Sequence, residues 1–172
     1  MQKNKRFKPI RVLKISPEQV LCFAGSGTKE FVGTDPEGDK QTYTARMNSL
    51  RFFVFKRSRR CVCCGLYGTL MILEFNSSTA GSPHFNLYGV VNRRYVLMTK
   101  DHKQPKSKGG KDHLENLQCM CTICNKAKKN HDITLRDLRL KPAIADWIRL
   151  VKKEKACRRK RKLRRQHPSN KS

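Results

Sequence analysis

The stretch "TKDHKQPKSKGGKDHLENLQCMCTICNKAKKN", residues 99–130, gathers several chemically active residues into a short run. It opens with the pair Asp101 and His102, passes through a Gly-Gly turn at 109–110, and closes with a Cys-x-x-Cys motif and several lysines. Each feature alone is ordinary in a surface loop. Their occurrence together, in this order, predicts a single functional site.

A second Cys-x-x-Cys motif lies outside this stretch, and the two motifs together make a set of four cysteines. The two motifs are formed by Cys61 and Cys64, and by Cys121 and Cys124. Four thiolates at about 2.3 Å around one ion make a closed tetrahedral zinc site, which leaves no position for substrate. We therefore predict structural Zn²⁺. Buried free thiols are the alternative, and a redox motif would need a thioredoxin-like βαβ context that the sequence lacks.

The pairing of the cysteines has some freedom, because Cys63 and Cys119 lie next to the two motifs. The Cys-x-x-Cys spacing favours the set given above. Residues 65–120 lie between the motifs, so the ion would clamp an inserted structure at both ends. It would also fix the start of the helix that carries Asn125, and hold this residue against the strand end that carries Asp101 and His102.

Those three residues have the chemistry of phosphodiester hydrolysis. A neutral histidine has a pKa near neutrality, so His102 can accept a proton from water. The side chains of Asp101 and Asn125 supply oxygen ligands, which suit Mg²⁺ or another hard divalent cation. A two-metal site would usually need several clustered carboxylates, and the stretch offers only two more, Asp112 and Glu115. One metal ion and one histidine fit this supply better.

The segment "DHKQPKSKGGKDHLENLQCMCTICNKAKK" resembles the HNH endonucleases, whose core is a ββα-metal fold. The resemblance covers about residues 47–130, with "RRCVCCGLYG" as the first zinc half. It implies that His102 is the general base and that Asp101 and Asn125 bind the catalytic divalent ion. It also implies that Asn116 orients the histidine and shapes the loop. The last motif position is Asn rather than His, which makes this chain an HNN variant.

The charge of the chain indicates a polyanionic partner. The 172 residues carry a net charge of +26, from 39 Lys and Arg against 13 Asp and Glu. Neutralising phosphates releases counterions, so nucleic acid is the expected partner. Ribosomes and anionic membranes fit the same charge. We expect DNA, although nothing separates it from RNA by base chemistry. The expected phosphate contacts are Lys126, Lys128, Lys129, Arg158, Arg159, Lys160 and Arg161.

The function expected on these grounds is a metal-dependent endonuclease that nicks or cuts DNA. A non-catalytic zinc-containing nucleic-acid-binding protein is the alternative. No apolar run approaches the roughly 18 residues that span a bilayer, and no apolar signal segment follows the basic N-terminus. We expect a soluble intracellular protein of the cytoplasm or nucleoid, or of the nucleus or an organelle in a eukaryote, without a membrane or small-molecule cofactor. The oligomeric state is left open.

The predicted fold class is α+β: a ββα-metal core stapled by zinc, with a basic C-terminal helix. We expect an N-terminal extension over 1–45, the nuclease domain over 46–133 and a helical, basic extension over 134–172. Strands are predicted for "KPIRVLKI", "TLMILEF", "HFNLYGVV" and "RYVLMT". Helices are predicted for "SPEQVLCF", for the segment after Cys121, and from Pro142. The stretch "RFFVF" is predicted helical, with a strand as the alternative.

Four further expectations concern the C-terminal helix and the strand residues Glu74, His84 and Tyr88. The helix from Pro142 carries an apolar stripe at i, i+3, i+4 and i+7, which predicts core packing. It consists of Ile144, Trp147, Ile148 and Val151. Residues 152–165, with ten basic residues and one acid, are expected to contact phosphates or to act as a nuclear-import signal. Glu74 is expected at the surface of a strand edge. His84 and Tyr88 should share one strand face, and whether His84 faces the site is left open.

Overall fold

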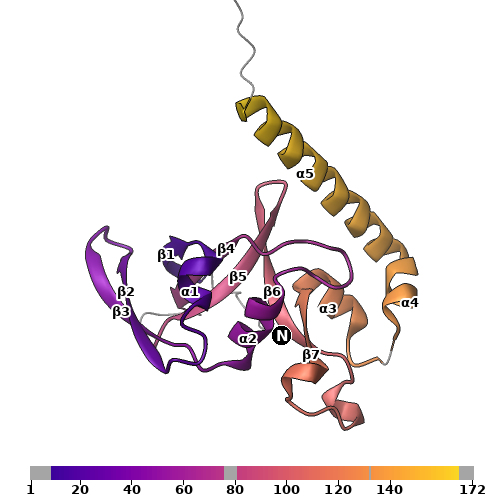
Figure 1. The fold of residues 1–172 in the computed structure, drawn as a ribbon, viewed down its shortest axis with the longest axis horizontal. Coiled ribbons are helices and arrows are strands. Elements are labelled where there is room, and N and C mark those ends of the chain that lie inside the picture. The colour runs from indigo at the N-terminus through magenta and orange to yellow at the C-terminus, as the bar shows by residue number, and fades with distance from the viewer. Residues whose placement is uncertain (1–8, 76–80, 132, 167–172) are drawn as a thin grey trace, which may run out of the picture.

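The computed structural model describes residues 9–75, 81–131 and 133–166 (Figure 1). The strands are β1 (Ile10–Ile15), β2 (Thr28–Thr34), β3 (Lys40–Arg46), β4 (Leu70–Phe75), β5 (His84–Val91), β6 (Arg94–His102) and β7 (Leu117–Cys121). The helices are α1 (Pro17–Leu21), α2 (Leu50–Arg57), α3 (Thr122–Lys128), α4 (Leu135–Leu140) and α5 (Pro142–Gln166). Two short 3₁₀ turns, η1 (Lys106–Lys108) and η2 (Leu114–Asn116), lie between β6 and β7.

An antiparallel sheet of five strands, in the order β1-β4-β5-β6-β7, organises the molecule. Strands β4, β5 and β6 follow one another as a meander, and their apolar sequences account for the predicted strands. Strand β1 pairs with β4, with Arg11 opposite Glu74, and Val12 belongs to the common core. The described part of residues 1–45 therefore packs on the segment predicted as the nuclease domain. The α+β class is confirmed.

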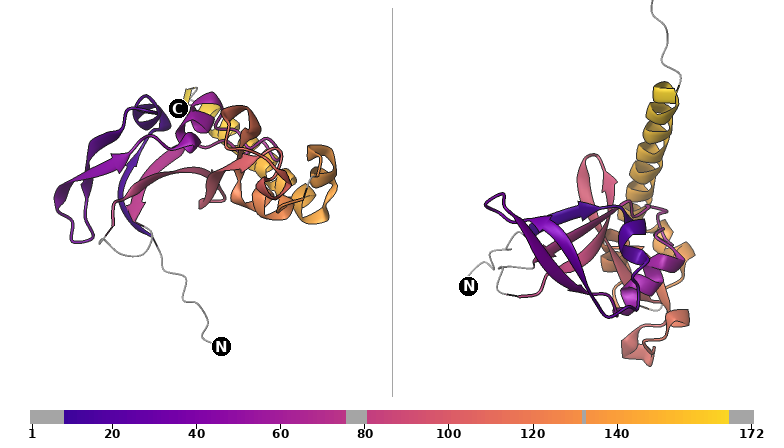
Figure 2. Two further views of the ribbon diagram at one scale, coloured as in Figure 1. Left: turned by 90° about the horizontal axis from the view of Figure 1, so that it is seen from below. Right: turned by 60° about the vertical axis from the view of Figure 1, so that its left-hand side comes forward.

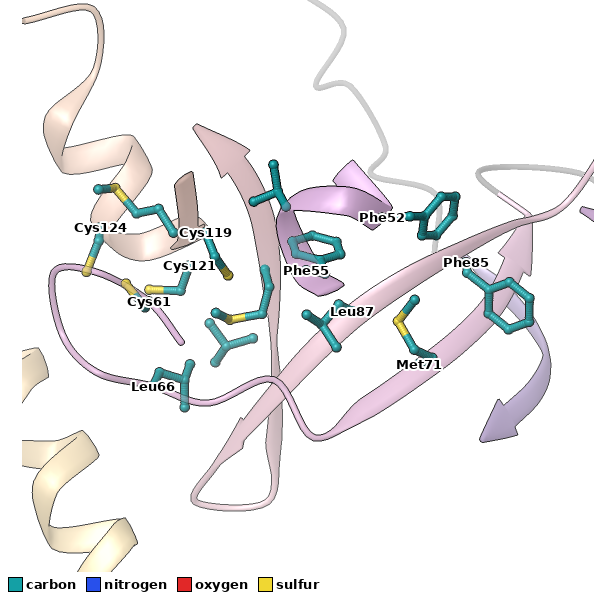
Figure 3. Close-up of a cluster of buried hydrophobic side chains, with 14 of the residues drawn as sticks. Phe52, Phe55, Cys61, Leu66, Met71, Phe85, Leu87, Cys119, Cys121 and Cys124 are labelled. Atoms are coloured by element: carbon teal, nitrogen blue, oxygen red, sulfur yellow. The ribbon is translucent and has the colours of Figure 1, made fainter. Parts of the chain in front are cut away.

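Helix α2 covers one face of this sheet (Figures 1 and 3). Its Phe52 and Phe55 are fully buried, and they belong to the same core as Met71 and Leu87 of the sheet. Phenylalanines three positions apart lie on the same side of a helix, so "RFFVF" buries both rings when it is helical. The helix is thus the correct prediction for this stretch, and the alternative strand does not form.

Three elements were not predicted from the sequence. The hairpin β2–β3 has mixed, mostly polar strands, and it contributes to the core the buried Ala45 and the partly buried rings of Phe31 and Tyr43. The segment "LQCMC" forms β7 because it pairs with β6 from Met98 to His102. Helix α4 is a short amphipathic turn that buries Leu138. No described helix combines the length and the apolar character that a bilayer-spanning segment requires.

Helix α5 begins at Pro142 as predicted and docks through its first half. Ile144 and Val151 are buried, and Trp147 and Ile148 are partly buried against the core, which confirms the predicted stripe. The helix then runs away from the body (Figure 1). At 25 residues it is about 37 Å long. Beyond Val151 two thirds of its residues are basic, and its side chains are largely exposed.

Candidate active site and metal centre

The site is built by β6, β7 and α3, which are consecutive elements apart from the loop with η1 and η2 that joins the two strands. Strand β7 pairs antiparallel with β6, so that Asp101 lies opposite Gln118 and His102 opposite Leu117. Helix α3 starts directly after β7 and packs on β6. As a result the Asn125 Nδ2 donates to Thr99 Oγ1 at 3.0 Å. The two strands and the helix are the ββα arrangement expected from the sequence.

Asp101, His102 and Asn125 line one surface pocket of about 260 Å³. The pocket has a strongly basic lining: Lys100, Lys106, Lys128 and Lys129 contribute to it. The structure thus brings together three of the four residues expected at the catalytic centre, although 24 positions separate Asp101 from Asn125. The fourth, Asn116, lies in the loop that leads from β6 to β7.

Asp101 is buried and forms an ion pair with a lysine of α3. The Lys128 Nζ lies 3.1 Å from Asp101 Oδ1 and 2.9 Å from Oδ2, and it also donates to the His102 carbonyl oxygen. Gln118 Nε2 donates to the same carboxylate at 2.8 Å. Asp101 is 6% exposed and Lys128 is 3% exposed. The prediction that Lys128 contacts substrate phosphates is therefore wrong.

The burial of Lys128 follows from its position on α3. It lies three residues after Asn125, and residues three apart share one helix face. Because Asn125 faces β6, Lys128 faces it as well and meets the strand end at Asp101. The neighbours Lys126 and Lys129 are exposed, Lys129 at the rim of the pocket, and both remain available to an anionic ligand.

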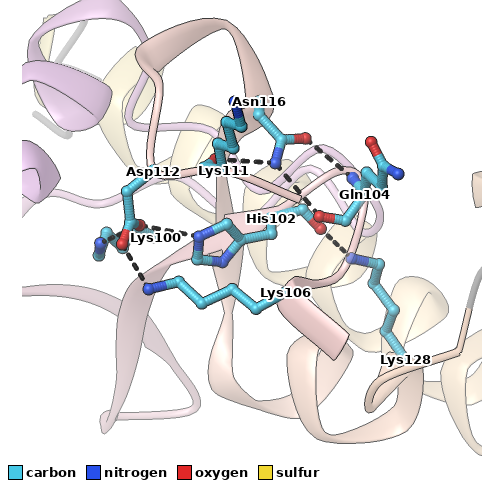
Figure 4. A network of polar contacts seen from close by, with 8 residues as sticks. All are labelled: Lys100, His102, Gln104, Lys106, Lys111, Asp112, Asn116 and Lys128. Carbon is cyan, nitrogen blue, oxygen red and sulfur yellow. Dashed lines mark hydrogen bonds and ion pairs between the residues drawn. The ribbon is translucent and has the colours of Figure 1, made fainter. Parts of the chain in front are cut away.

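His102 makes a contact that the sequence analysis did not assign: its Nε2 lies 2.8 Å from Asp112 Oδ1 (Figure 4). Asp112 also accepts from Lys106, and from Lys100 Nζ at 3.0 Å. Lys106, Lys100 and His102 hold the pKa of the Asp112 carboxyl well below its usual range. An ionised carboxylate only accepts hydrogen bonds, so the Nε2 of His102 carries the proton. In the neutral ring, Nδ1 is then the free acceptor.

Asn116 ties the two ends of the loop between β6 and β7 (Figure 4). Its Oδ1 accepts from the Gln104 N–H at 2.9 Å, and its Nδ2 donates to the carbonyls of Gln104 at 3.2 Å and Lys111 at 3.0 Å. Gly110 lies inside this closure, where a Cβ would come within 1.9 Å of the Gln104 oxygen. The Gly-Gly turn and Asn116 thus shape the loop that places Asp112 beside His102.

The four predicted zinc cysteines come together as a separate cluster. The Sγ atoms of Cys61, Cys64, Cys121 and Cys124 all lie within 4.8 Å of one another, and all four residues are buried. Figure 3 shows Cys61, Cys121 and Cys124 side by side. In a tetrahedral site with bonds of about 2.3 Å, sulfur atoms lie about 3.8 Å apart. The 3.7 Å between the sulfurs of Cys64 and Cys121 matches this spacing. The cluster therefore fits a metal such as zinc.

The neighbouring cysteines do not belong to this cluster. Cys119 is buried two positions before Cys121 on β7, but the four-sulfur group does not include it. Burial raises the pKa of the Cys119 thiol to about 12, which keeps it protonated. The Cys-x-x-Cys spacing thus selected the four cysteines that the structure brings together. Cys63, also buried, lies outside the group too.

The side chains in the pocket also fit a divalent cation. Asp101 offers a carboxylate, and Asn125, which donates through Nδ2, presents its oxygen as an acceptor. Both are oxygen donors of the kind that hard cations bind. The ammonium group of Lys128 already neutralises Asp101, so a divalent ion bound there would compete with it. His84, whose role was left open, lies outside this pocket on β5 and contacts Asn86.

The remaining predicted phosphate contacts lie on α5. Arg159, Lys160 and Arg161 are exposed. Arg158 is engaged within the protein: it pairs with Glu154 at 2.9 Å and donates to the Val90 carbonyl, which fastens α5 to the end of β5. Three of the four α5 residues are therefore available to a ligand without breaking an internal contact seen here.

Comparison with known proteins agrees with this site. Residues 90–131 match the family model described as HNH endonuclease. The matched residues contain β6, the loop with Asn116, β7 and α3. Searches among curated proteins and among solved structures each find no match.

Proposed function

Since residues 90–131 belong to the HNH endonuclease family, we propose that this chain is a metal-dependent endonuclease that hydrolyses phosphodiester bonds in DNA. The observation that carries the proposal is that Asp101, His102 and Asn125 line one pocket with a basic rim. A general base and oxygen ligands for a cation are the groups that this hydrolysis needs, and they meet where a phosphate can enter.

In the proposed reaction His102 takes the proton of the attacking water through Nδ1. The carboxylate of Asp112 holds the ring by Nε2 at 2.8 Å, so the ring cannot turn without losing this contact. Asp101 and Asn125 would hold the divalent ion, which when bound supplies positive charge to the phosphoryl and leaving oxygens. Lys126 and Lys129 at the end of α3 would contact the substrate backbone.

The alternative is a zinc module that binds nucleic acid without cleaving it. The positive charge and the cysteine cluster suit both functions equally. The His102–Asp112 contact favours the enzyme, because a binding module gains nothing from a histidine held in one tautomer beside a carboxylate. DNA is proposed as the substrate on charge and family membership, and cleavage of RNA is an outcome of the same assay.

The test is cleavage of supercoiled plasmid DNA in Mg²⁺, with EDTA as the blank, by the wild type and by His102→Ala. Loss of a general base lowers the rate by about 10²- to 10⁴-fold. We expect that loss, with zinc content and DNA affinity retained. Mapping the ends of the products would distinguish nicks from double-strand cuts.

His113→Ala is the matched control, because His113 is an exposed histidine in the same loop. It should cut at the wild-type rate. If His102→Ala also cuts at that rate, His102 is not the general base. If the wild type binds plasmid but leaves it intact in Mg²⁺, Mn²⁺ and Ca²⁺ alike, the binding module is the better description.

A further inference from the structure

The sheet carries a polar and aromatic cluster on the face opposite to its apolar core. Along β4, Leu73 and Phe75 join the core while Glu74 points to the other side. The helices α1 and α2 lie together on the core face (Figure 2). The cluster on the opposite face consists of Arg11, Lys14, Glu74, Asn86, Tyr88 and Tyr95, from β1, β4, β5 and β6. We call it the outer-face cluster.

Glu74 is the buried anchor of the outer-face cluster. It was predicted at the surface of a strand edge, but β4 lies between β1 and β5, and Glu74 is 1% exposed. Its carboxylate accepts from Tyr88 Oη, from Asn86 Nδ2 at 2.7 Å and from Arg11 Nε at 3.2 Å. Burial and this carboxylate raise the pKa of Tyr88 to about 12, so its hydroxyl remains a donor.

This anchor holds a cationic and aromatic stack at the surface. The Arg11 guanidinium lies 4.9 Å from the centre of the Tyr95 ring and 5.6 Å from that of Tyr88. The Lys14 ammonium lies 5.9 Å from the Tyr95 ring. Tyr95 is 38% exposed, and Lys14 is exposed beside it. Buried Glu74 thus fixes Arg11 against the tyrosines, which leaves a rigid and partly open platform.

We propose that the outer-face cluster is a second nucleic-acid contact, in which an unpaired base stacks on the Arg11–Tyr95 platform and the cations of Arg11 and Lys14 meet the backbone. Single strands are bound by this combination of aromatic or guanidinium planes with positive charge. The net charge of the chain excludes most basic partners and favours a polyanion.

The position of the platform links it to the pocket on the same strand. Tyr95, Thr99 and Asp101 occupy alternate positions of β6, so their side chains start from one face of it. Six residues of strand span about 20 Å, which corresponds to about six base pairs of duplex. One nucleic acid lying along β6 would therefore reach both sites. Binding at the platform does not depend on cleavage, so this proposal stands even if the proposed nuclease activity is disproved.

The test is binding of a labelled oligothymidylate of about 20 nucleotides, and of its duplex with oligoadenylate, in EDTA. Tyr95→Ala should weaken single-strand binding about 5- to 30-fold and leave duplex binding within about twofold, because duplex bases are not free to stack. Tyr95→Phe keeps the ring and should bind as the wild type does. Lys14→Ala should lower the salt slope by about 0.7, the value of one phosphate contact.

Tyr67→Ala is the matched control. Tyr67 is also exposed beneath an arginine, with Arg59 at 5.0 Å from its ring, but it lies outside the outer-face cluster. It should bind single strands as the wild type does. Unchanged binding by a folded Tyr95→Ala would overturn the proposal. So would an equal loss on single strand and duplex, or a loss of affinity for phosphatidylserine vesicles in place of DNA.

Discussion

Two neighbouring residues of α3 belong to sites of opposite character. Cys124 is fully buried and is one member of the closed group of four sulfurs. Asn125 instead lines an open, basic pocket with Asp101 and His102. The first site has every ligand supplied by the protein. The second has oxygen donors on one side and solvent on the other. Consecutive residues of one short helix thus belong to the cysteine cluster and to the pocket.

The cysteine cluster holds in place the helix that contributes Asn125 to the pocket. The cysteine cluster joins the segment before β4 to the β7–α3 junction, and Cys64 and Cys121 lie 57 positions apart in the sequence. It thereby fixes the first turn of α3. The pocket takes its geometry from this fixed turn, so the two sites should respond differently to substitution.

The largest effect is expected from breaking the closed site with Cys121→Ser. Structural zinc contributes about 10–16 kcal/mol in small zinc-binding peptides, which equals or exceeds the stability of an ordinary domain. We expect the variant to lose zinc and its cooperative melting transition, together with any activity. Atomic absorption and a thermal melt followed by circular dichroism measure the two losses.

Cys119→Ser is the control for this variant, because Cys119 is buried on the same strand but lies outside the four-sulfur group. It should keep one zinc per chain and melt at a somewhat lower temperature. A Cys121→Ser variant with normal zinc content would show that the ligand assignment is wrong.

The two sites also differ in how much of each could be predicted from the sequence alone. The four cysteines that come together in the closed site were predicted as one set, because metal ligation needs fixed residue types at fixed spacing and leaves little freedom. In the open site the sequence predicted that Asp101, His102 and Asn125 lie together, but it did not predict the side chains that support them. Lys128 was misassigned to the surface, although its spacing from Asn125 on α3 would have placed it on the inner face.

Other parts of the fold depend on tertiary pairing that no local pattern reveals. Glu74 looks like a surface residue in "TLMILEF", and only the pairing of β1 with β4 shows that it is buried. The β2–β3 hairpin and β7 were missed for the same reason. By contrast, strongly apolar strands and the long stripe of α5 were predicted correctly, because burial alone determines them.

A smaller effect is expected when the open site loses its buried lysine. Lys128→Met leaves the Asp101 carboxylate buried with Gln118 as its remaining partner seen here, and breaking such a pair costs about 3–5 kcal/mol. We expect a lower free energy of unfolding in EDTA, part of which Mg²⁺ restores by binding at Asp101. Urea denaturation with and without Mg²⁺ measures both the loss of unfolding free energy and its recovery by the ion.

Lys126→Met, at an exposed position of the same helix, should change neither the free energy of unfolding in EDTA nor its response to Mg²⁺. If Lys128→Met is as stable as Lys126→Met, the ion pair with Asp101 contributes nothing to the fold. If Mg²⁺ stabilises the two variants equally, the cation does not bind at Asp101, and the divalent ligands proposed here are incorrect.

The smallest effect is expected from Asp112→Asn, which keeps the shape of the loop and removes only charge. The amide oxygen can still accept from His102 Nε2, but the amide no longer attracts the three groups that now hold it, Lys106, Lys100 and His102. The ring should be less firmly oriented, and the cleavage rate should fall about 10- to 100-fold, as when the partner of a functional histidine is removed.

Glu115→Gln, an exposed acid of the same loop, removes an equal charge without touching His102 and should leave the rate unchanged. The loss should appear in kcat rather than KM, because Asp112 acts on the base and not on substrate binding. An equal loss in both variants would mean that loop charge, rather than the Asp112 contact, governs the rate.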